Sequence, residues 1–502
     1  MAGLADDLSG SLSGGSSGGS EGGLSGGSPG GAADGFSGKA VDTGMGALIQ
    51  TLFDRKDDGL PYLAHQQEIV TRGELRGRVA RQAEVFAGYG IGPGSTVGLR
   101  TPPSFTQVEV ALALWRLGAQ VMLFDFRLKP AEVEALCATC RPRFMVRAGS
   151  NARAAFGFRP EYEVVTECRA TGRPATTGHG LLQFSSGSTG RPKVVGRTVR
   201  SLAAEVERFA AIPGMPGEGD RLLLLSSTMH SFGLIGGLLH SLAAGVCVVF
   251  TPRVTARDIL RSAVDHRIAA LFGVPMHYEL LAAAPDPPQL PGLRVAVSGG
   301  EMMPPEVAAR FAERYGVPVG ESYGTTETGV VAMDVRGALR PSVGRPAPGV
   351  VVREHKGELD VALEESPYLF GSGGAQYADG WLHTRDRATV DDTGAVRLHG
   401  RADSLVVIGG LKVDLTEVEH VLRRHPAVDQ AVLVHEGVTE AYVAVAAGEE
   451  RPSAEELLRW CRERLADYKL PKVIRLLESL PRTSNGKLVR QAATLQAAAA
   501  GA

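Results

Sequence analysis

The sequence has few of the features that mark secreted, membrane or nucleic-acid-binding proteins. It holds only five cysteines in 502 residues, and such a sparse, odd set argues against a disulfide framework and fits a reducing cytoplasm. Lysine and arginine total 53 against 55 aspartate and glutamate, a formal net charge of -2. No basic excess is therefore present to bind nucleic acid or an anionic membrane. The first residues lack the basic and apolar stretches of a secretory signal. We expect a cytoplasmic protein with neither nucleic acid nor membrane as a partner.

Long hydrophobic runs are also missing. The most apolar segment, Leu234 to Phe250, is interrupted by His240 and Gly245 and is short for a membrane span. We interpret it as a helix that leads into a buried strand. Cys137 and Cys140 form a C-x-x-C pair, but no second pair accompanies it, and a structural zinc needs four ligands. No metal is expected there.

Both ends of the sequence have low complexity. Residues 1–45 are dominated by glycine and serine, which bury little apolar area, so a disordered tail is predicted. Residues 496–502 are rich in alanine and form a second predicted tail.

Between the tails, helical and strand patterns alternate, which predicts an α/β fold with mainly parallel sheets. A helix over Glu74–Tyr89 precedes a strand at Ser95–Leu99, and a helix over Gln107–Leu117 precedes a strand at Val121–Phe124. Short strands such as Glu358–Ala362 follow later in the chain. We predict a large N-terminal domain over 46–400 that ends in a short β-rich part, and a small mobile α+β C-terminal domain over 401–495.

A polar, glycine-rich loop is the most informative feature that the sequence does contain. The run from Gln183 to Thr198 reads QFSSGSTGRPKVVGRT. Small residues and hydroxyls let backbone N–H groups approach a polyphosphate, and a lysine adds positive charge. The run is not a Walker A loop, because no Gly-Lys-Ser/Thr stands at the required offset. Taken alone, it could also be a flexible surface turn. The candidate phosphate-binding residues are Ser185, Ser186, Gly187, Ser188, Thr189, Gly190 and Lys193.

Four further motifs follow in order. In the first, ESYGTTE, Tyr323 offers an aromatic face for a purine, Thr325 and Thr326 offer hydroxyls for phosphate, and Glu327 offers a carboxylate for Mg²⁺. The other three are GWLHTRD ending at Asp386, GRAD with the following VIGGLK between Gly400 and Lys412, and PRTSNGK ending at Lys487.

In this order, the five motifs resemble those of the adenylate-forming (ANL) superfamily of acyl- and aryl-CoA synthetases, adenylation domains and luciferases. The resemblance extends from about residue 46 to residue 495. It implies an enzyme that uses ATP and Mg²⁺ to join a carboxylic acid to AMP and then passes the acyl group to a thiol. Its charged groups would position the reactants and stabilise charge rather than form covalent bonds.

The resemblance also implies roles for individual residues. Lys487 would bridge the acyl carboxylate and the α-phosphate, and Glu327 would hold Mg²⁺. Asp386 would bind the ribose hydroxyls with help from Arg401, and Asp403 would be the hinge of the small domain. The adenine and phosphate segment would be Ser322, Tyr323, Gly324, Thr325 and Thr326, with the tyrosine against the base; Gly409 and Gly410 would leave room for a pantetheine arm. Without the resemblance, Lys487 and Asp403 would pass for ordinary solvated residues.

Three positions depart from the family pattern. Val194 stands where glycine usually follows the loop lysine, and Arg385 stands where glycine usually precedes the ribose-binding aspartate. Arg197-Thr198 replaces the usual Thr-His after the loop. None of the three removes a charged catalytic group. The side chain of Arg385 could contact phosphate or point to solvent.

The family's acyl-pocket segment corresponds to residues 228–233, which include His230 and Phe232 but no acid. Members that activate amino acids place an aspartate there to pair the ammonium group. Because an unpaired buried ammonium is costly, an aromatic or other apolar carboxylic acid is expected. His230 would gate the pocket or contact the acyl carboxylate, and counts with Lys487, Thr326 and Glu327 as a candidate catalytic residue. The predicted pocket residues are His230, Phe232, Phe272, Val274, Met276, Ser298, Gly299, Gly300 and Met333; the apolar ones could also be plain core.

The leading hypothesis is an acyl- or aryl-CoA ligase that uses ATP, Mg²⁺ and CoA. The stretch VVIGGLKVDLTEVE closely resembles that of aryl-CoA ligases. One alternative is a stand-alone adenylating enzyme that loads the pantetheine of an acyl carrier protein. Another is a non-catalytic protein that binds a nucleotide or an acyl ligand, against which the four charged motif residues Glu327, Asp386, Arg401 and Lys487 argue. The sequence is compatible with a homo-oligomer.

Overall fold

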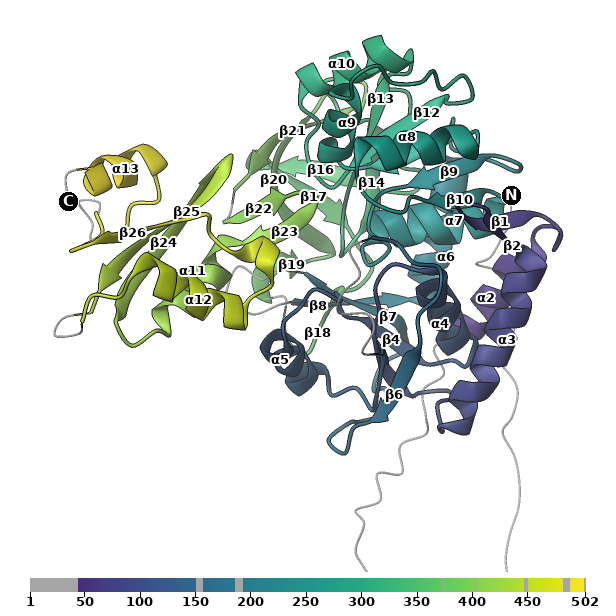
Figure 1. Cartoon of the computed structure of the whole chain (residues 1–502), viewed down its shortest axis with the longest axis horizontal. Coiled ribbons are helices and arrows are strands. Elements are labelled where there is room, and N and C mark those ends of the chain that lie inside the picture. The colour runs from purple at the N-terminus through teal and green to yellow at the C-terminus, as the bar shows by residue number, and fades with distance from the viewer. Residues whose placement is uncertain are drawn as a thin grey trace, which may run out of the picture.

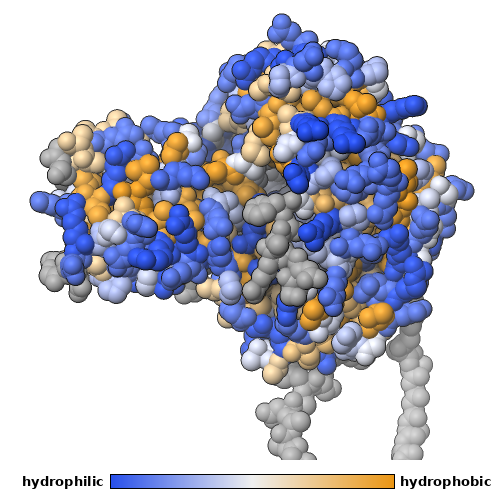
Figure 2. All heavy atoms as spheres, viewed as in Figure 1, coloured by the Kyte–Doolittle hydropathy of each residue, from blue (hydrophilic) through white to orange (hydrophobic). Residues whose placement is uncertain are grey.

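The computed structural model describes residues 44–149, 157–185, 193–372, 374–402, 404–446, 450–481 and 488–500. A large lobe and a small lobe lie side by side in contact with each other (Figures 1 and 2). The large lobe carries three sheets, and the small lobe lies at the left of both views. No helix among the described residues is both long enough and apolar enough to cross a membrane.

The first sheet of the large lobe has seven strands in the order β18-β8-β7-β4-β3-β5-β6. The four central strands run parallel, and the three edge strands are antiparallel to their neighbours. The central strand β4 is buried at every position, as expected for a parallel strand covered on both faces. The strands are β3 (Thr96–Arg100), β4 (Gln120–Leu123), β5 (Phe144–Ala148), β6 (Val164–Cys168), β7 (His179–Ser185), β8 (Lys193–Thr198) and β18 (Tyr368–Leu369).

The second sheet has nine strands in the order β15-β14-β13-β12-β11-β9-β10-β1-β2. Its six central strands are parallel, and β2, β14 and β15 pair antiparallel at the edges. The strands are β1 (Pro61–His65), β2 (Glu68–Thr71), β9 (Arg221–Leu224), β10 (Cys247–Phe250), β11 (Ala270–Gly273), β12 (Val295–Gly299), β13 (Val319–Thr325), β14 (Gly329–Asp334) and β15 (Arg345–Pro346).

Helices pack on both sheets and start where the sequence provides caps. Thr71, Ser104, Thr198 and Thr255 each accept a hydrogen bond from a backbone N–H in the first turn of the helix that follows, which satisfies a donor that the helix leaves free. The helices are α2 (Met45–Asp54), α3 (Arg72–Gly88), α4 (Phe105–Arg116), α5 (Pro130–Cys140), α6 (Val199–Ala211), α7 (His240–Ala244), α8 (Ala256–Asp265), α9 (Pro275–Ala282) and α10 (Pro305–Tyr315).

A π-helix, η2 (Phe232–Leu239), occupies the first half of the segment in which the sequence predicted an ordinary helix. Two glycines permit its close packing, since a Cβ on Gly236 would lie 2.7 Å from Phe209 and one on Gly237 would lie 2.8 Å from Leu224. Helices of this type are rare and are frequently found at functional sites. The predicted strand follows as β10.

The third sheet of the large lobe is antiparallel and corresponds to the predicted β-rich part. Its order is β16-β17-β20-β19, and β21 also pairs with β20. The strands are β16 (Val352–His355), β17 (Glu358–Ala362), β19 (Tyr377–Ala378), β20 (Trp381–Val390) and β21 (Val396–Arg401); a short 3-10 helix, η3 (Gly374–Gln376), precedes β19.

The small lobe begins with a hairpin of β22 (Leu405–Ile408) and β23 (Leu411–Asp414). A three-stranded sheet follows, made of β24 (Val428–Glu436), β25 (Val438–Val445) and β26 (Val473–Leu477). Its helices are α11 (Leu415–Arg423), α12 (Ala454–Arg464), α13 (Ala492–Ala500) and a short 3-10 helix, η4 (Asp467–Lys469). The predicted α/β class, with a large and a small domain, is confirmed.

The two predicted tails are shorter than the sequence suggested. Met45 is fully buried and begins α2, although it was assigned to the N-terminal tail. The alanine-rich end is helical as far as Ala500. Alanine has the highest helix propensity, and the buried residues Ala492 and Leu495 fix α13 on the small lobe. Residues 1–43 lie outside the described part of the chain.

Candidate active site

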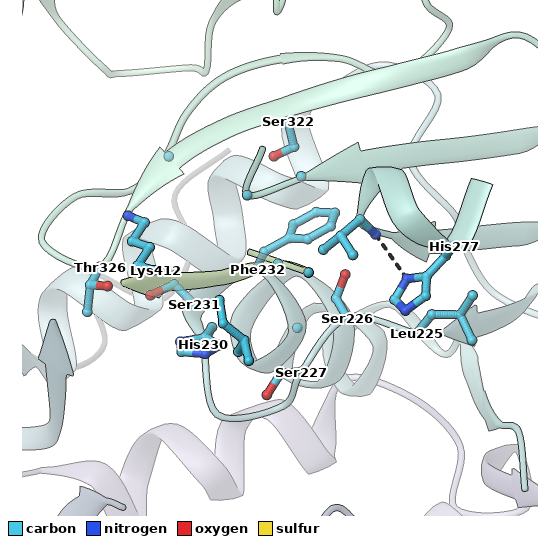
Figure 3. Close-up of a pocket in the computed structure, with 18 of the residues that line it drawn as sticks. Leu225, Ser226, Ser227, His230, Ser231, Phe232, His277, Ser322, Thr326 and Lys412 are labelled. Atoms are coloured by element: carbon cyan, nitrogen blue, oxygen red, sulfur yellow. Dashed lines mark hydrogen bonds between the residues drawn. The ribbon is translucent and has the colours of Figure 1, made fainter. Parts of the chain in front are cut away.

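A cavity of about 380 Å³ lies where the carboxyl ends of β9, β11 and β12 meet η2 and the small lobe. Ligands usually bind at the carboxyl ends of the strands in parallel α/β sheets. In Figure 3, Thr326, Lys412 and His230 lie toward one side of the pocket, and Leu225 and His277 lie toward the other. The predicted site residues that line the cavity are His230, Phe232, Val274, Met276, Gly299, Gly300, Ser322, Gly324, Thr325, Thr326, Gly409 and Gly410.

Three residues predicted to line the acyl pocket do not line this cavity, which corrects the prediction. Phe272 has no exposed surface and stacks behind Phe232, with ring centroids 5.2 Å apart. Ser298 and Met333 are buried within β12 and β14. Successive residues of a strand face opposite sides of a sheet, so Gly299 can line the cavity while its neighbour Ser298 does not.

Glycine makes one wall of the cavity thin. A Cβ on Gly299 would lie 2.9 Å from the Phe232 ring, so a side chain there would displace the aromatic residue. Gly300 has a φ of +87°, a backbone conformation that favours glycine. The predicted thin wall is therefore formed by Gly299 and Gly300.

The two loop motifs with phosphate-binding character both lie at antiparallel hairpins. Ser185 ends β7 and pairs with Lys193 at the start of β8. The ESYGTTE motif runs from β13 into the turn before β14, where Thr325 pairs with Gly329. The sequence predicted a loop after a strand but not that the chain returns beside it.

A smaller cavity of about 40 Å³ is lined by Ser185 together with charged residues that include Lys193, Glu327 and Arg401. The carboxylate of Glu327 accepts hydrogen bonds from the hydroxyls of Ser185, at 3.1 Å, and Tyr368, at 3.3 Å. It forms no salt bridge with a described lysine or arginine. Two hydroxyls and a carboxylate supply oxygen atoms of the kind that Mg²⁺ prefers.

A third cavity of about 110 Å³ contains the residues expected at the base and ribose. The Tyr323 hydroxyl donates to Asp386 Oδ2 at 2.6 Å, and Arg401 Nη1 donates to Asp386 Oδ1 at 2.8 Å. Burial, followed by the charge of Asp386, raises the pKa of Tyr323 well above its ordinary value. The small lobe contributes Leu405 and Val407 to the same cavity.

Several predicted site residues lie outside the described part of the chain. They are Ser186, Gly187, Ser188, Thr189 and Gly190 of the phosphate loop, the hinge residue Asp403, and Lys487. Their predicted roles stay predictions.

Two of the three departures from the family pattern acquire a local explanation. Arg385 has a φ of +64°, the conformation that glycine adopts at least cost. Its guanidinium lies 3.7 Å from Glu358 on the lobe surface, so the arginine forms an ion pair rather than pointing freely to solvent. Val194 is buried, and its N–H donates to Ser372 Oγ at 3.0 Å.

The third departure, Arg197, forms a buried ion pair that supports the ESYGTTE turn. Its Nη2 lies 2.6 Å from Glu205 of α6, and the side chains are 4% and 0% exposed. Glu205 also accepts the N–H of Val330 at 3.1 Å. A Cβ on Gly329 would lie 2.1 Å from the Glu205 carboxylate, so the pair fixes the backbone just after the motif.

His230 lies between the main cavity and a fourth cavity of about 100 Å³. Desolvation lowers the pKa of His230 to about 4, opposed by the nearby charge of Asp125. Its Nε2 has no hydrogen-bond partner among the described residues. At neutral pH the side chain is therefore an uncharged imidazole.

Lys412 is a residue whose role the sequence analysis missed. It lines all four cavities, because β23 carries it between the two lobes. The sequence signal was present, since a lysine follows the two glycines of the VIGGLK loop. Only the arrangement of the lobes shows that this lysine faces the site. The backbone N–H of Gly410 donates to Glu301 of the large lobe.

A cluster of His355, Asp360 and His383 on the third sheet resembles a metal site by residue type. His383 Nδ1 lies 2.8 Å and His355 Nδ1 3.4 Å from the carboxylate of Asp360. However, Arg353 donates from Nε to Asp360 Oδ2 at 3.0 Å and forms an ion pair with it. The carboxylate is thus already neutralised, and its neighbourhood disfavours a cation.

Comparison with known proteins agrees with this geometry. The AMP-binding enzyme family matches residues 55–359, and the AMP-binding enzyme C-terminal domain matches residues 417–487. The chain therefore belongs to the AMP-binding enzyme family. It is similar to feruloyl-CoA synthase of Amycolatopsis sp., with 27% identity over 475 residues that cover 85% of this chain and 94% of the relative.

Two structures of o-succinylbenzoate CoA synthetase from Bacillus subtilis differ in their similarity to this chain. A double mutant bound with its product analogue has a TM-score of 0.74 at 24% identity, covering 88% of this chain and 96% of that one. The complex with AMP has a TM-score of 0.60 at 25% identity, with the same coverage. The overall arrangement is thus closer to that of the product-analogue complex.

Proposed function

We propose that the protein is an AMP-forming acid–thiol ligase, which adenylates a carboxylic acid and transfers the acyl group to the thiol of CoA. One observation carries the proposal. Thr325 and Thr326 of the ESYGTTE motif and the glycine loop of the small lobe line the same cavity. The family assignment and the similarity to a feruloyl-CoA synthase support it.

The residues present fit ATP and Mg²⁺. Tyr323, Asp386 and Arg401 would hold the base and ribose, and Ser185 and Lys193 would face the phosphates. Glu327 would hold Mg²⁺, which supplies charge neutralisation on the phosphates. Lys487 would bring positive charge to the acyl carboxylate and the α-phosphate during adenylation, as its motif implies.

The acid is proposed to be aromatic or otherwise apolar. None of the described residues that line the main cavity is acidic, so an ammonium group would lack a partner. Phe232, Val274, Met276 and Val330 supply apolar surface. His230, being neutral, would contact the acyl carboxylate without adding a fixed charge.

The thiol is proposed to reach the cavity beside Gly409 and Gly410. The similarity to the product-analogue complex of a CoA synthetase supports an arrangement for thioester formation. Under this proposal the small domain turns about Asp403 between the two half-reactions, a slow collective motion that could limit turnover.

The test is a panel of aromatic, aliphatic and α-amino acids incubated with ATP and Mg²⁺. Pyrophosphate release is followed with CoA, with a pantetheinylated carrier protein, and with neither. The proposal expects release with an apolar acid and an acyl-CoA product. Thioester on the carrier alone would identify the adenylating alternative, and nucleotide binding without release from any acid would refute the enzyme.

A further inference from the structure

A buried lysine links the two lobes. Lys469, at the end of η4, has a side chain that is only 8% exposed. Its Nζ lies 2.8 Å from Glu132 of α5 in the large lobe and 2.8 Å from Glu417 of α11 in the small lobe. Lys469 and Glu132 are 337 residues apart in the sequence. The contact therefore exists only while the lobes keep this orientation.

The charges of this triad depend on one another. Burial opposes the charge on Lys469, but Glu417, Tyr468 and Glu132 more than offset it, and the pKa of Lys469 is raised. Burial raises the pKa of Glu417 even though Lys469 lowers it. Without the lysine, two carboxylates would face each other in a desolvated place, which is strongly unfavourable.

Other contacts also join the region of α5 to η4, but their side chains are more exposed. Lys129 lies 3.0 Å from Asp467, which is 77% exposed, and exposed pairs of this kind contribute little. The guanidinium of Arg127 lies 5.2 Å from the Tyr468 ring, a cation–π contact. Lys469 is thus the most enclosed ionic link between these segments.

The same orientation completes the candidate site. The cavity of about 100 Å³ beside His230 is lined by Glu417 and Lys469 as well as by Thr326 and Lys412. The glycines of the β22–β23 loop line the main cavity at the same time. The triad therefore borders the site at the point where the small lobe closes it.

We propose that Lys469 and Glu132 are positioning residues for the second half-reaction. Resting on the proposed function, the inference is that their ion pair holds the small lobe in the thioester-forming orientation. Adenylation, in which the small lobe would present Lys487 instead, does not need the pair.

The chain offers a clean substitution and a matched control. Glu132 Oε2 also accepts the backbone N–H of Lys129, at 2.9 Å, at the start of α5. Glu132→Gln removes the charge but keeps an oxygen acceptor for that cap. The control is Glu134→Gln on the same helix, because Glu134 is 63% exposed and pairs with Arg169 inside the large lobe.

The first measurement compares the two half-reactions in Glu132→Gln, Lys469→Met and the double variant. Pyrophosphate release without CoA reports adenylation, and thioester formation from preformed acyl-adenylate reports the second step. We expect each single variant to slow thioester formation on the order of tenfold or more, because each breaks the ion pair between Lys469 and Glu132 that joins the two lobes, with adenylation unchanged. The double variant should be no slower than the worse single variant. Equal losses in both steps, or additive effects, would overturn the proposal.

A second measurement does not depend on turnover. The exposed native Cys168 of the large lobe and a cysteine introduced at Val438, which is 46% exposed in the small lobe, carry a fluorescent donor and acceptor. Energy transfer in Glu132→Gln should show a smaller population in the orientation described here, and Glu134→Gln should match the parent protein. An unchanged distribution would refute the positioning role, even if the acid panel had failed to reveal ligase activity.

Discussion

The two walls of the main cavity are built differently. The large-lobe wall follows the ends of β9, β11 and β12, whose side chains belong to extended apolar clusters. The small-lobe wall is a two-stranded hairpin that reaches the cavity through glycines, backed by the buried ion pairs of Lys469. Apolar packing is non-directional and cumulative, whereas an ion pair depends on geometry. We call the first the permanent wall and the second the removable wall, because the proposed turn of the small domain would withdraw only the second.

The largest expected effect concerns the permanent wall. Arg197→Met should lower the free energy of unfolding by about 3–5 kcal/mol, because it leaves Glu205 charged and buried without its partner. Urea unfolding of the large-lobe transition measures the loss. The Arg197→Met/Glu205→Gln double variant should recover much of it, since glutamine can still accept the Val330 N–H. A single-variant loss below about 1 kcal/mol, the value of an exposed pair, would contradict the burial of the pair.

The next effect concerns the removable wall. Lys487→Ala should reduce pyrophosphate release on the order of 100-fold or more, because it removes a positive charge expected at the α-phosphate only during adenylation. Thioester formation from preformed acyl-adenylate should be largely preserved. Single-turnover assays of the two steps supply the measurement. A similar fall in both steps would mean that Lys487 does not distinguish them and that the contrast between the walls is wrong.

A smaller effect should follow pH. Desolvation lowers the pKa of His240 and of His277 to about 4, against 6.5 for an ordinary histidine. Below pH 6.5 these histidines are therefore protonated in the unfolded chain but remain neutral in the folded chain. The folded state loses stability as the pH falls from 6.5 toward 4, and it keeps that stability above pH 6.5. Each histidine contributes about 1.4 kcal/mol per pH unit in that window. Urea unfolding at pH 7, 6 and 5 should show how the free energy of unfolding depends on pH. His240→Leu should reduce this slope by the amount that corresponds to one proton taken up on unfolding. An unaltered slope would mean that His240 is charged when buried.

The smallest expected effect concerns the contact between the glycine loop of the small lobe and the large lobe. In this orientation a Cβ on Gly410 would lie 2.9 Å from Val274 Cγ1, whereas a Cβ on Gly409 would lie 4.0 Å from its nearest neighbour, Met276. Both glycines have positive φ, so Gly410→Ala and Gly409→Ala share the backbone strain but not the clash. Gly410→Ala should slow thioester formation on the order of tenfold more than Gly409→Ala, a difference of about 1.4 kcal/mol.

The matched rescue is Val274→Ala in the Gly410→Ala background, which should restore much of the difference. If both alanine variants were equally slow in thioester formation, strain rather than contact with the large lobe would explain the loss.

The sequence predicted the fold class, the two-domain arrangement and the order of the motifs, because each motif is a short contiguous run whose residue types indicate its chemistry. Asp386 and Arg401 could be placed together by resemblance, and they do share a carboxylate–guanidinium contact. Glycine-rich and hydroxyl-rich runs also indicated where the chain turns. Their return as the hairpins β7–β8 and β13–β14 could not be foreseen, since strand pairing depends on distant partners.

Other features depend on contacts between distant residues. Nothing local distinguishes Lys469 from an ordinary surface lysine, and its partner Glu132 lies in the other lobe. Phe272, Ser298 and Met333 were misassigned to the acyl pocket because composition does not show which face of a strand looks toward a cavity. The helix α13 was missed because an alanine run bordered by glycine reads as low complexity, although Leu495 anchors it.

The π-helix η2 allows the lining of the pocket to change through the number of residues in the helix rather than through a substitution. Its wide turns set the angular position of Phe232 and Gly233 relative to the buried glycines that follow. Each residue of an ordinary helix advances the chain by about 100°. Deleting one residue of η2 would therefore turn the ring of Phe232 away from its stack on Phe272 and present a different side chain to the acid. Under the proposed function, changes in chain length at η2 would thus alter acid selectivity without a single substitution among the lining residues.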